Sequence, residues 1–116
     1  PGLRIQGFQL EATGEARSYA YQFTVSQVLK NVGLATGQIW ISIDGTQAGK
    51  SRRLALQDVT AETKESLKMR FRYFQNVEGI IQLPQGFSPD SFNVKVKPKN
   101  KKLAPVAANF KWTLSG

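Results

Sequence analysis

The sequence predicts an all-β fold, an antiparallel β-sandwich of immunoglobulin-like type with about seven to eight strands. Apolar and polar residues alternate in short runs, which is the pattern of a strand with one buried face. Turns that contain Gly or Pro separate these runs, which start roughly 10–15 residues apart. No stretch shows the apolar period of an amphipathic helix. We therefore expect a single domain over residues 1–116, built from two stacked antiparallel sheets.

Three strands are expected in the first part of the chain. The first covers 3–10, and its alternation changes phase at Gly7, which predicts a β-bulge there. The clearest alternation covers 19–25, with aromatic residues on one face. The third strand covers 38–43, with isoleucines on one side and Trp40 on the other. Either both faces of this strand are buried, or Trp40 lies exposed in a groove.

The rest of the chain continues the pattern. A tight turn is predicted at Asp44–Gly45 and a second at Gly49–Lys50, followed by a short strand over 53–59. The polar segment 60–65 is expected to hold at most one helical turn. Further alternating runs predict strands over 67–74, 80–83, 92–97 and 109–114, with a solvated hairpin tip within 97–105.

The composition argues against most kinds of catalytic site. The chain has no Cys and no His, which removes disulfides, the usual zinc sites and Ser-His or Cys-His nucleophilic catalysis. Its eight carboxylates lie mostly in predicted turns. An enzyme without Cys and His would need two of them facing each other in a cleft, such as Glu78 and Asp90. The sequence AGKS at 48–51 lacks the glycine spacing of a phosphate-binding loop, so a β-turn is expected. We expect a protein that is not an enzyme, with no catalytic residues, cofactor or metal.

The net charge of +8 is unevenly distributed. Residues 1–58 carry six basic and four acidic groups (+2), whereas residues 59–116 carry ten and four (+6). Much of the excess forms a candidate anion-binding cluster: Lys95, Lys97, Lys99, Lys101 and Lys102. The alternative is that these lysines face water and protect an edge strand from pairing with other chains. No aromatic residue is interleaved with them, which argues against nucleic acid as the ligand.

A second candidate surface combines arginines with aromatic residues. Arg70 and Arg72 alternate with apolar residues and are expected on one face together with Phe74. Because Arg and aromatic side chains dominate protein interfaces, these three residues and Phe87 are candidate contacts for a protein partner. The alternative is that they form the polar outside of a sandwich strand.

Several blocks of the chain together resemble a known family. The most specific are Phe-Arg-Tyr-Phe-Gln at 71–75 and Leu-Pro-Gln-Gly-Phe-Ser-Pro at 83–89. The others are Gly2-Leu3-Arg4-Ile5, Phe8-Gln9-Leu10, Tyr21-Gln22-Phe23, the run from Val25 to Leu29, Gly37-Gln38-Ile39, Glu78-Gly79, Val94 and Val96. Over nearly its whole length the chain resembles the C-terminal domain of an uncharacterised family of proteobacterial inner-membrane proteins.

The resemblance implies an architecture and a location. Family members have a short cytoplasmic start, one transmembrane helix, a coiled coil and then this domain in the periplasm. No apolar run in this chain approaches the roughly 20 residues of a membrane-spanning helix, and the chain begins at Pro1. We therefore expect a domain excised from a longer membrane-anchored protein, whose upstream coiled coil would make it a dimer.

The resemblance also implies a setting for the function. The family's genes lie near those for a bactofilin and a cell-wall peptidase. The expected function is a non-enzymatic periplasmic module that binds an envelope protein, such as a peptidoglycan hydrolase or a bactofilin-associated complex, in cell-wall or cell-shape machinery. The alternative is a basic module that binds an anionic polymer: nucleic acid, which is disfavoured, or a lipid or wall polyanion.

Overall fold

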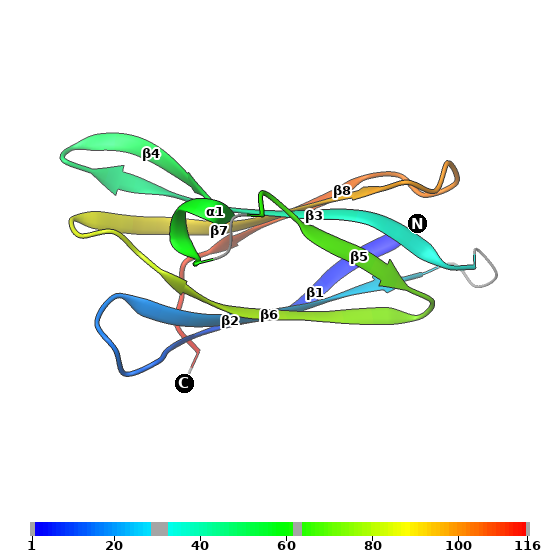
Figure 1. Cartoon of the computed structure of the whole chain (residues 1–116), viewed down its shortest axis with the longest axis horizontal. Helices are drawn as coiled ribbons and strands as arrows, with labels where there is room; N and C mark the ends of the chain where they lie inside the picture. The colour runs from blue at the N-terminus through cyan, green and yellow to red at the C-terminus, as the bar shows by residue number, and fades with distance from the viewer. Residues whose placement is uncertain (1, 29–32, 62–63, 116) are drawn as a thin grey trace.

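The structure, a computed structural model, describes residues 2–28, 33–61 and 64–115. Two antiparallel sheets of three and five strands pack face to face as an unclosed sandwich (Figure 1), which confirms the predicted all-β class. The smaller sheet contains β1 (Leu3–Ala12), β2 (Ser18–Gln27) and β6 (Phe74–Gln82). The larger contains β3 (Ala35–Gln47), β4 (Lys50–Ala55), β5 (Leu67–Phe71), β7 (Phe87–Pro98) and β8 (Val106–Lys111).

Strand β3 organises the larger sheet. One of its edges pairs with β7, which in turn pairs with β8. Its other edge is shared, because β5 pairs with Ala35–Ile39 and β4 pairs with Ser42–Gln47. The short helix α1 (Leu56–Val59) follows β4 and contributes two buried residues to the core. In the smaller sheet, β2 lies between β1 and β6.

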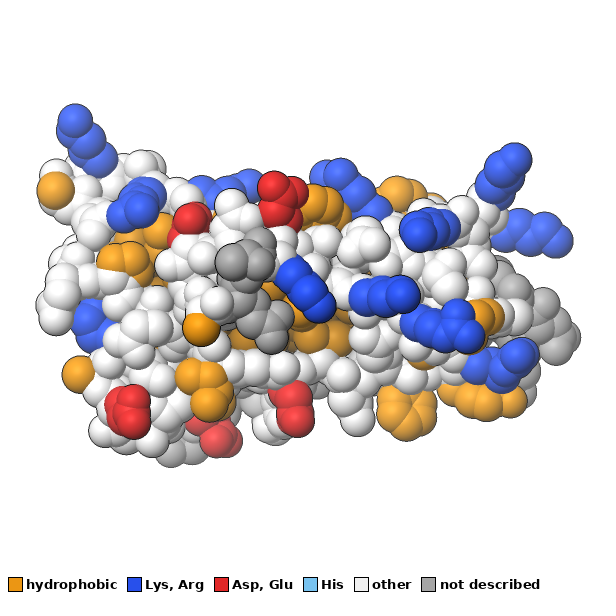
Figure 2. Space-filling view, viewed as in Figure 1, with side chains coloured by type: hydrophobic (Ala, Val, Ile, Leu, Met, Phe, Trp, Pro, Cys, Tyr) orange, Lys and Arg blue, Asp and Glu red, His pale blue; other side chains and the backbone are white. Residues whose placement is uncertain are grey.

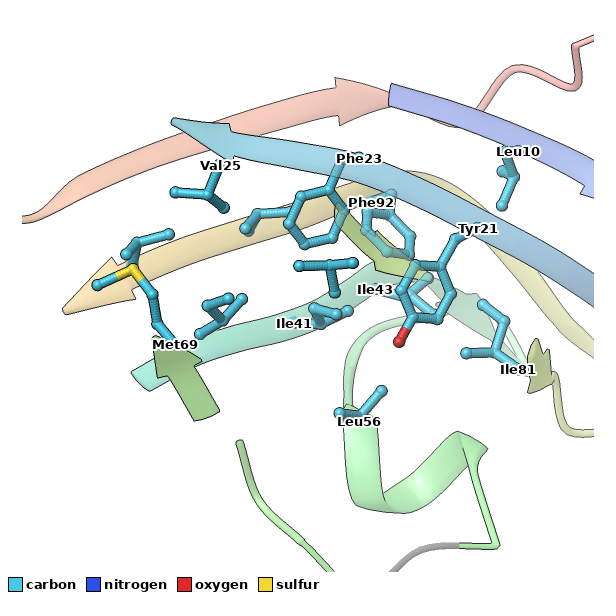
Figure 3. Packing of buried hydrophobic residues seen from close by; sticks show 14 of the residues in the cluster. Leu10, Tyr21, Phe23, Val25, Ile41, Ile43, Leu56, Met69, Ile81 and Phe92 are labelled. Carbon is cyan, nitrogen blue, oxygen red and sulfur yellow. The ribbon is translucent and has the colours of Figure 1, made fainter. Parts of the chain in front are cut away.

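The core lies between the two sheets and has an aromatic centre (Figure 3). Phe92 of β7 packs against Tyr21 and Phe23 of β2, with ring centroids 5.2 and 6.4 Å away. On the side where β1 meets β8, Phe8 stacks on Phe110 at 4.5 Å. The alternation that predicted the strands therefore supplies the inward-facing side chains of both sheets, whose burial stabilises the fold.

One predicted irregularity is confirmed and one predicted turn is wrong. The register of β1 against β2 shifts between Gln6 and Gln9, around the expected bulge. The expected turn at Asp44–Gly45 does not form, because β3 continues to Gln47. Gly45 instead allows a close approach of β7, since a Cβ there would lie 2.1 Å from the carbonyl oxygen of Ser88.

The segment after β3 also differs from prediction. The chain reverses at Ala48 and Gly49, both with positive φ (53° and 77°), so AGKS does form a tight turn. The predicted strand over 53–59 is wrong in its second half, because β4 ends at Ala55 and α1 follows. The side chain of Asp58 accepts a hydrogen bond from the Ala55 amide at 2.8 Å and fixes the start of α1. Part of 60–65, where a helical turn was expected, lies outside the described residues.

Candidate interaction surface on the larger sheet

On the outer face of the larger sheet, rows of residues cross three strands, and the positions on either side of β3 are cations. Lys68 of β5 and Lys97 of β7 both pair with Gln38 of β3. Residues directly opposite each other in an antiparallel pair share a face, so the two ammonium groups flank Gln38 on the outside of the sheet. In the next row Arg70 pairs with Thr36, and the amide of Lys99 donates to the Thr36 carbonyl at 2.7 Å.

Trp40 lies on the same outer face. It pairs with Lys95, and the Nζ of Lys97 lies 5.5 Å from the centre of its ring, within range of a cation–π interaction. The indole Nε1 is buried, yet within the described part of the chain it donates no hydrogen bond. The structure lies between the two alternatives for Trp40: the outer face of the central strand β3 is half-buried, and the Trp40 side chain lines a groove without being fully exposed.

The groove has a volume of about 430 Å³ and crosses β4, β3, β7 and β8. Ser42, Ala55 and Ala107 are small, which leaves the space open beside Trp40. Most of the charged and polar groups around it are hydrogen-bond donors, and Glu65 is the carboxylate in its lining. We call Trp40 and the surrounding cations the basic face: Trp40, Lys68, Arg70, Lys95, Lys97 and Lys99.

An ion pair limits the negative charge beside the groove. The guanidinium of Arg53 donates to both oxygens of Asp44, at 2.6 and 2.9 Å, and Asn93 donates to one of them at 3.1 Å. The hydrogen bond from Arg53 is the main reason that the pKa of Asp44 lies below its ordinary value of 3.8, while partial burial opposes that shift. Asp44 is therefore ionised near neutral pH and already paired.

A glutamine holds β5 in position. The side-chain oxygen of Gln75 accepts from the amide of Arg70 at 2.8 Å, and its nitrogen donates to the carbonyl of Lys68 at 3.0 Å. These are the groups that β5 exposes along the edge away from β3, so Gln75 pairs with that edge as a neighbouring strand would. The sequence pattern did not reveal this role, because Gln has no special place in strand alternation.

The structure brings together residues from both sequence hypotheses. Arg70, a candidate protein contact, shares the basic face with Lys95, Lys97 and Lys99, which were candidate anion-binding residues. The remaining two lysines of that cluster, Lys101 and Lys102, lie exposed in the β7–β8 turn. That turn confirms the predicted hairpin tip.

The other candidate protein contacts lie elsewhere. The expectation that Arg70, Arg72 and Phe74 share one face is wrong, because β5 ends at Phe71 and the chain then crosses to the smaller sheet. Phe74 pairs there with Ser26, on that sheet's outer face. Phe87 is only 2% exposed, in the core, so its ring is not available to a partner.

A family comparison identifies the chain's relatives. The profile of a family of unknown function, DUF6776, matches residues 1–94. The chain belongs to this family. No protein with a curated description matches it significantly. A similar solved structure is an X-ray structure of the Northeast Structural Genomics Consortium target SoR45, with 11% identity and a TM-score of 0.38 over 95% of this chain and 82% of that one.

The outer face of the smaller sheet in this DUF6776 member has a different character. A groove of about 630 Å³ runs across it, lined by Glu11 and Glu78 together with glutamines and Ile80. Asp90, which the sequence paired with Glu78 as a possible acid–base couple, lies on β7 of the other sheet. Within the described residues no group of three or more acidic side chains could hold a metal ion, and no helix has the length and apolar character needed to cross a bilayer.

Proposed function

We propose that this domain is a non-enzymatic binding module whose basic face holds an acidic surface of a partner protein in the cell envelope. The observation that carries the proposal is an array of five cations on one face of the larger sheet. Lys95 and Lys97 of β7 lie beside Trp40, and the array continues to Lys68 and Arg70 of β5 and to Lys99 just after β7. Such a surface attracts negative charge and steers its approach. The resemblance to inner-membrane coiled-coil proteins supports a periplasmic setting, and a peptidoglycan hydrolase or a bactofilin-associated complex as the partner.

The groove favours a protein as the partner over a polyanion that is bound by charge alone. Trp and Arg are the residues most often responsible for binding energy at protein interfaces, and here Trp40 and Arg70 lie on one face. A buried donor without a partner costs about 1–3 kcal/mol. An acceptor from a bound protein would recover that cost if binding uncovers the Trp40 indole nitrogen, which is buried in the free domain.

A charge-matched pair of variants tests the proposal. Lys95→Glu/Lys97→Glu and Lys50→Glu/Arg52→Glu each lower the net charge from +8 to +4, because every replacement changes it by −2. Lys50 and Arg52 are exposed on β4, outside the basic face. We expect the native domain and the β4 variant to capture the same proteins from envelope extracts, and the β7 variant to lose them. Capture of the same proteins by all three would contradict the proposal.

A second candidate function is binding of an anionic polymer. It is supported by the regular array of cations, which repeat about every 7 Å along a strand and lie about 10 Å apart across β3. Binding to DNA, RNA or polyphosphate should then weaken steeply with added salt. If titrations at low salt show no association with any of the three, this candidate is ruled out.

A further inference from the structure

Two neighbouring aromatic side chains project into water at the connection between β5 and β6. Tyr73 is 75% exposed and Phe74 59% exposed. Val28 is also exposed, and the amide before it, that of Gln27, donates to the Tyr73 carbonyl, so the three lie at the same end of the sandwich. Single exposed apolar residues are common, but adjacent large ones more often mark an interaction site.

The connection that carries these rings is fixed to both sheets. From the smaller sheet, the Gln27 amide donates to the carbonyl of Tyr73 at 3.2 Å and its side chain donates to the carbonyl of Arg72 at 2.9 Å. At the other end of the connection, the Gln75 side chain forms hydrogen bonds to the edge of β5 in the larger sheet. Hydrogen bonds therefore fix the backbone that carries the two rings, which reduces the conformational entropy lost on binding.

This end of the molecule is uniformly basic. Strand pairing and backbone hydrogen bonds bring together five segments there: 2–6, 24–28, 33–38, 68–76 and 96–103. They contain eight Lys and Arg and no Asp or Glu. Figure 2 shows Lys and Arg most densely in the half that ends beside protruding hydrophobic side chains, where no Asp or Glu is seen; the other half carries both Lys and Arg and the acidic side chains of this view.

We propose that this basic end docks on an anionic lipid bilayer. The rings of Tyr73 and Phe74 enter the interfacial region, and Arg72 and Arg4 contact lipid phosphates. Arg4 belongs to the same row of the smaller sheet as Phe74, because both pair with Ser26. This function goes beyond the proposed one. Its anchoring rings and the two arginines named above lie outside the basic face, although Lys68, Arg70, Lys97 and Lys99 contribute positive charge to both surfaces.

The shape of the tip favours a bilayer over a folded partner. Tyr73 and Phe74 protrude and line none of the grooves described above. A protruding ring needs a matching cavity in a folded partner, whereas the bilayer interface is soft and admits Tyr and Phe without one. Cations beside the rings are attracted to anionic headgroups, which adds to the apolar contribution.

Sedimentation with vesicles tests the inference. We expect the native domain to bind mixed phosphatidylcholine–phosphatidylglycerol vesicles and to bind pure phosphatidylcholine weakly. Tyr73→Ser/Phe74→Ser should reduce binding roughly tenfold or more, because both apolar anchors are lost. The control Ile80→Ser/Leu114→Ser, which removes exposed apolar side chains elsewhere, should bind as the native domain does.

Three outcomes would overturn the inference: no binding by the native domain, equal binding to both vesicle types, or equal binding by the tip variant. A tip variant that loses a captured envelope protein while the native domain ignores vesicles would assign the tip to a protein interface. In a direct check, Phe74→Trp should show quenching by brominated lipids beyond that of the native tryptophans. The tip variant keeps every residue of the basic face, so its partner capture reports separately on the proposed function.

Discussion

The outer faces of the two sheets share their strand geometry but differ in the sign of the charge that they leave unpaired. On the smaller sheet neighbouring strands bond to one another through side chains: Thr24 donates to Asn76 at 2.8 Å, and Gln22 donates to Gln9. On the larger sheet Lys68, Lys95 and Lys97 form no ion pair with any described residue. The larger sheet also has side-chain bonds between strands, from Arg53 and Asn93 to Asp44, and on the smaller sheet Glu11 and Glu78 form no ion pair with a described residue. The charge left for a ligand is therefore negative on the smaller sheet and positive on the basic face.

The comparison predicts that stability depends on the inner faces and binding on the basic face. Phe92→Ala should show the largest effect, a loss of about 3–5 kcal/mol in the free energy of unfolding, because its ring is fully buried between the sheets. Lys95→Ala, on the outer face of the same strand, should change that free energy by no more than about 0.5 kcal/mol. Denaturant titration measures both free energies. Similar losses in the two variants would contradict the claim that stability depends on the inner faces.

Glycine replacements compare the packing of the sheets. At Gly45 a Cβ would meet the Ser88 carbonyl at 2.1 Å, whereas at Gly79 it would meet the end of the Tyr21 ring at 2.7 Å. Backbone moves less readily than a side chain, so Gly45→Ala should cost about 3 kcal/mol and Gly79→Ala less. Thermal unfolding of the two variants, side by side, gives the order. A more severe loss at Gly79 would show that the smaller sheet is the more tightly constrained.

Removal of the glutamine that pairs with β5 should have a smaller and local effect. We expect Gln75→Ala to cost about 1 kcal/mol, since the Arg70 amide and Lys68 carbonyl lose one partner each at an exposed edge. Hydrogen exchange at the Arg70 amide should accelerate. Gln82→Ala is the control, because Gln82 bonds the Ala16 carbonyl near the β1–β2 turn. Unchanged exchange at Arg70 in the Gln75 variant would contradict the proposed role.

The ion pair beside the groove should have the smallest effect. Its side chains are well exposed, so Asp44→Asn should cost less than about 1 kcal/mol near neutral pH. Arg53 lowers the pKa of Asp44 in the folded state, so this stabilisation is present above the unfolded-state pKa and is lost as pH falls through the folded-state pKa. Unfolding free energies measured from neutral to strongly acidic pH should converge for the native domain and the variant. If the difference in unfolding free energy between the two proteins stays constant across that range, the ion pair is not the cause of the difference.

The strands were predictable because burial of one face imposes a period of two, which Tyr21, Phe23 and Phe92 follow. The basic face was not predictable, because Lys68 and Lys97 are far apart in the sequence and become neighbours only by pairing with opposite edges of β3. The crossing between sheets after Phe71 was also missed, since no Gly or Pro marks that bend. Local alternation specifies a strand, but pairing depends on contacts distant in the chain.

Nuclear magnetic resonance titration with poly-L-glutamate, a soluble acidic polypeptide, tests the basic face most directly. Trp40 and Trp112 supply the two indole N–H signals, and that of Trp40 comes from a buried nitrogen without a hydrogen-bond partner among the described residues. We predict shifts at the Trp40 indole and at the amides of Lys68, Lys95 and Lys97, with Gln9, Gln22 and Glu78 on the smaller sheet unaffected. Shifts confined to the smaller sheet, or an unchanged spectrum at low salt, would contradict the account.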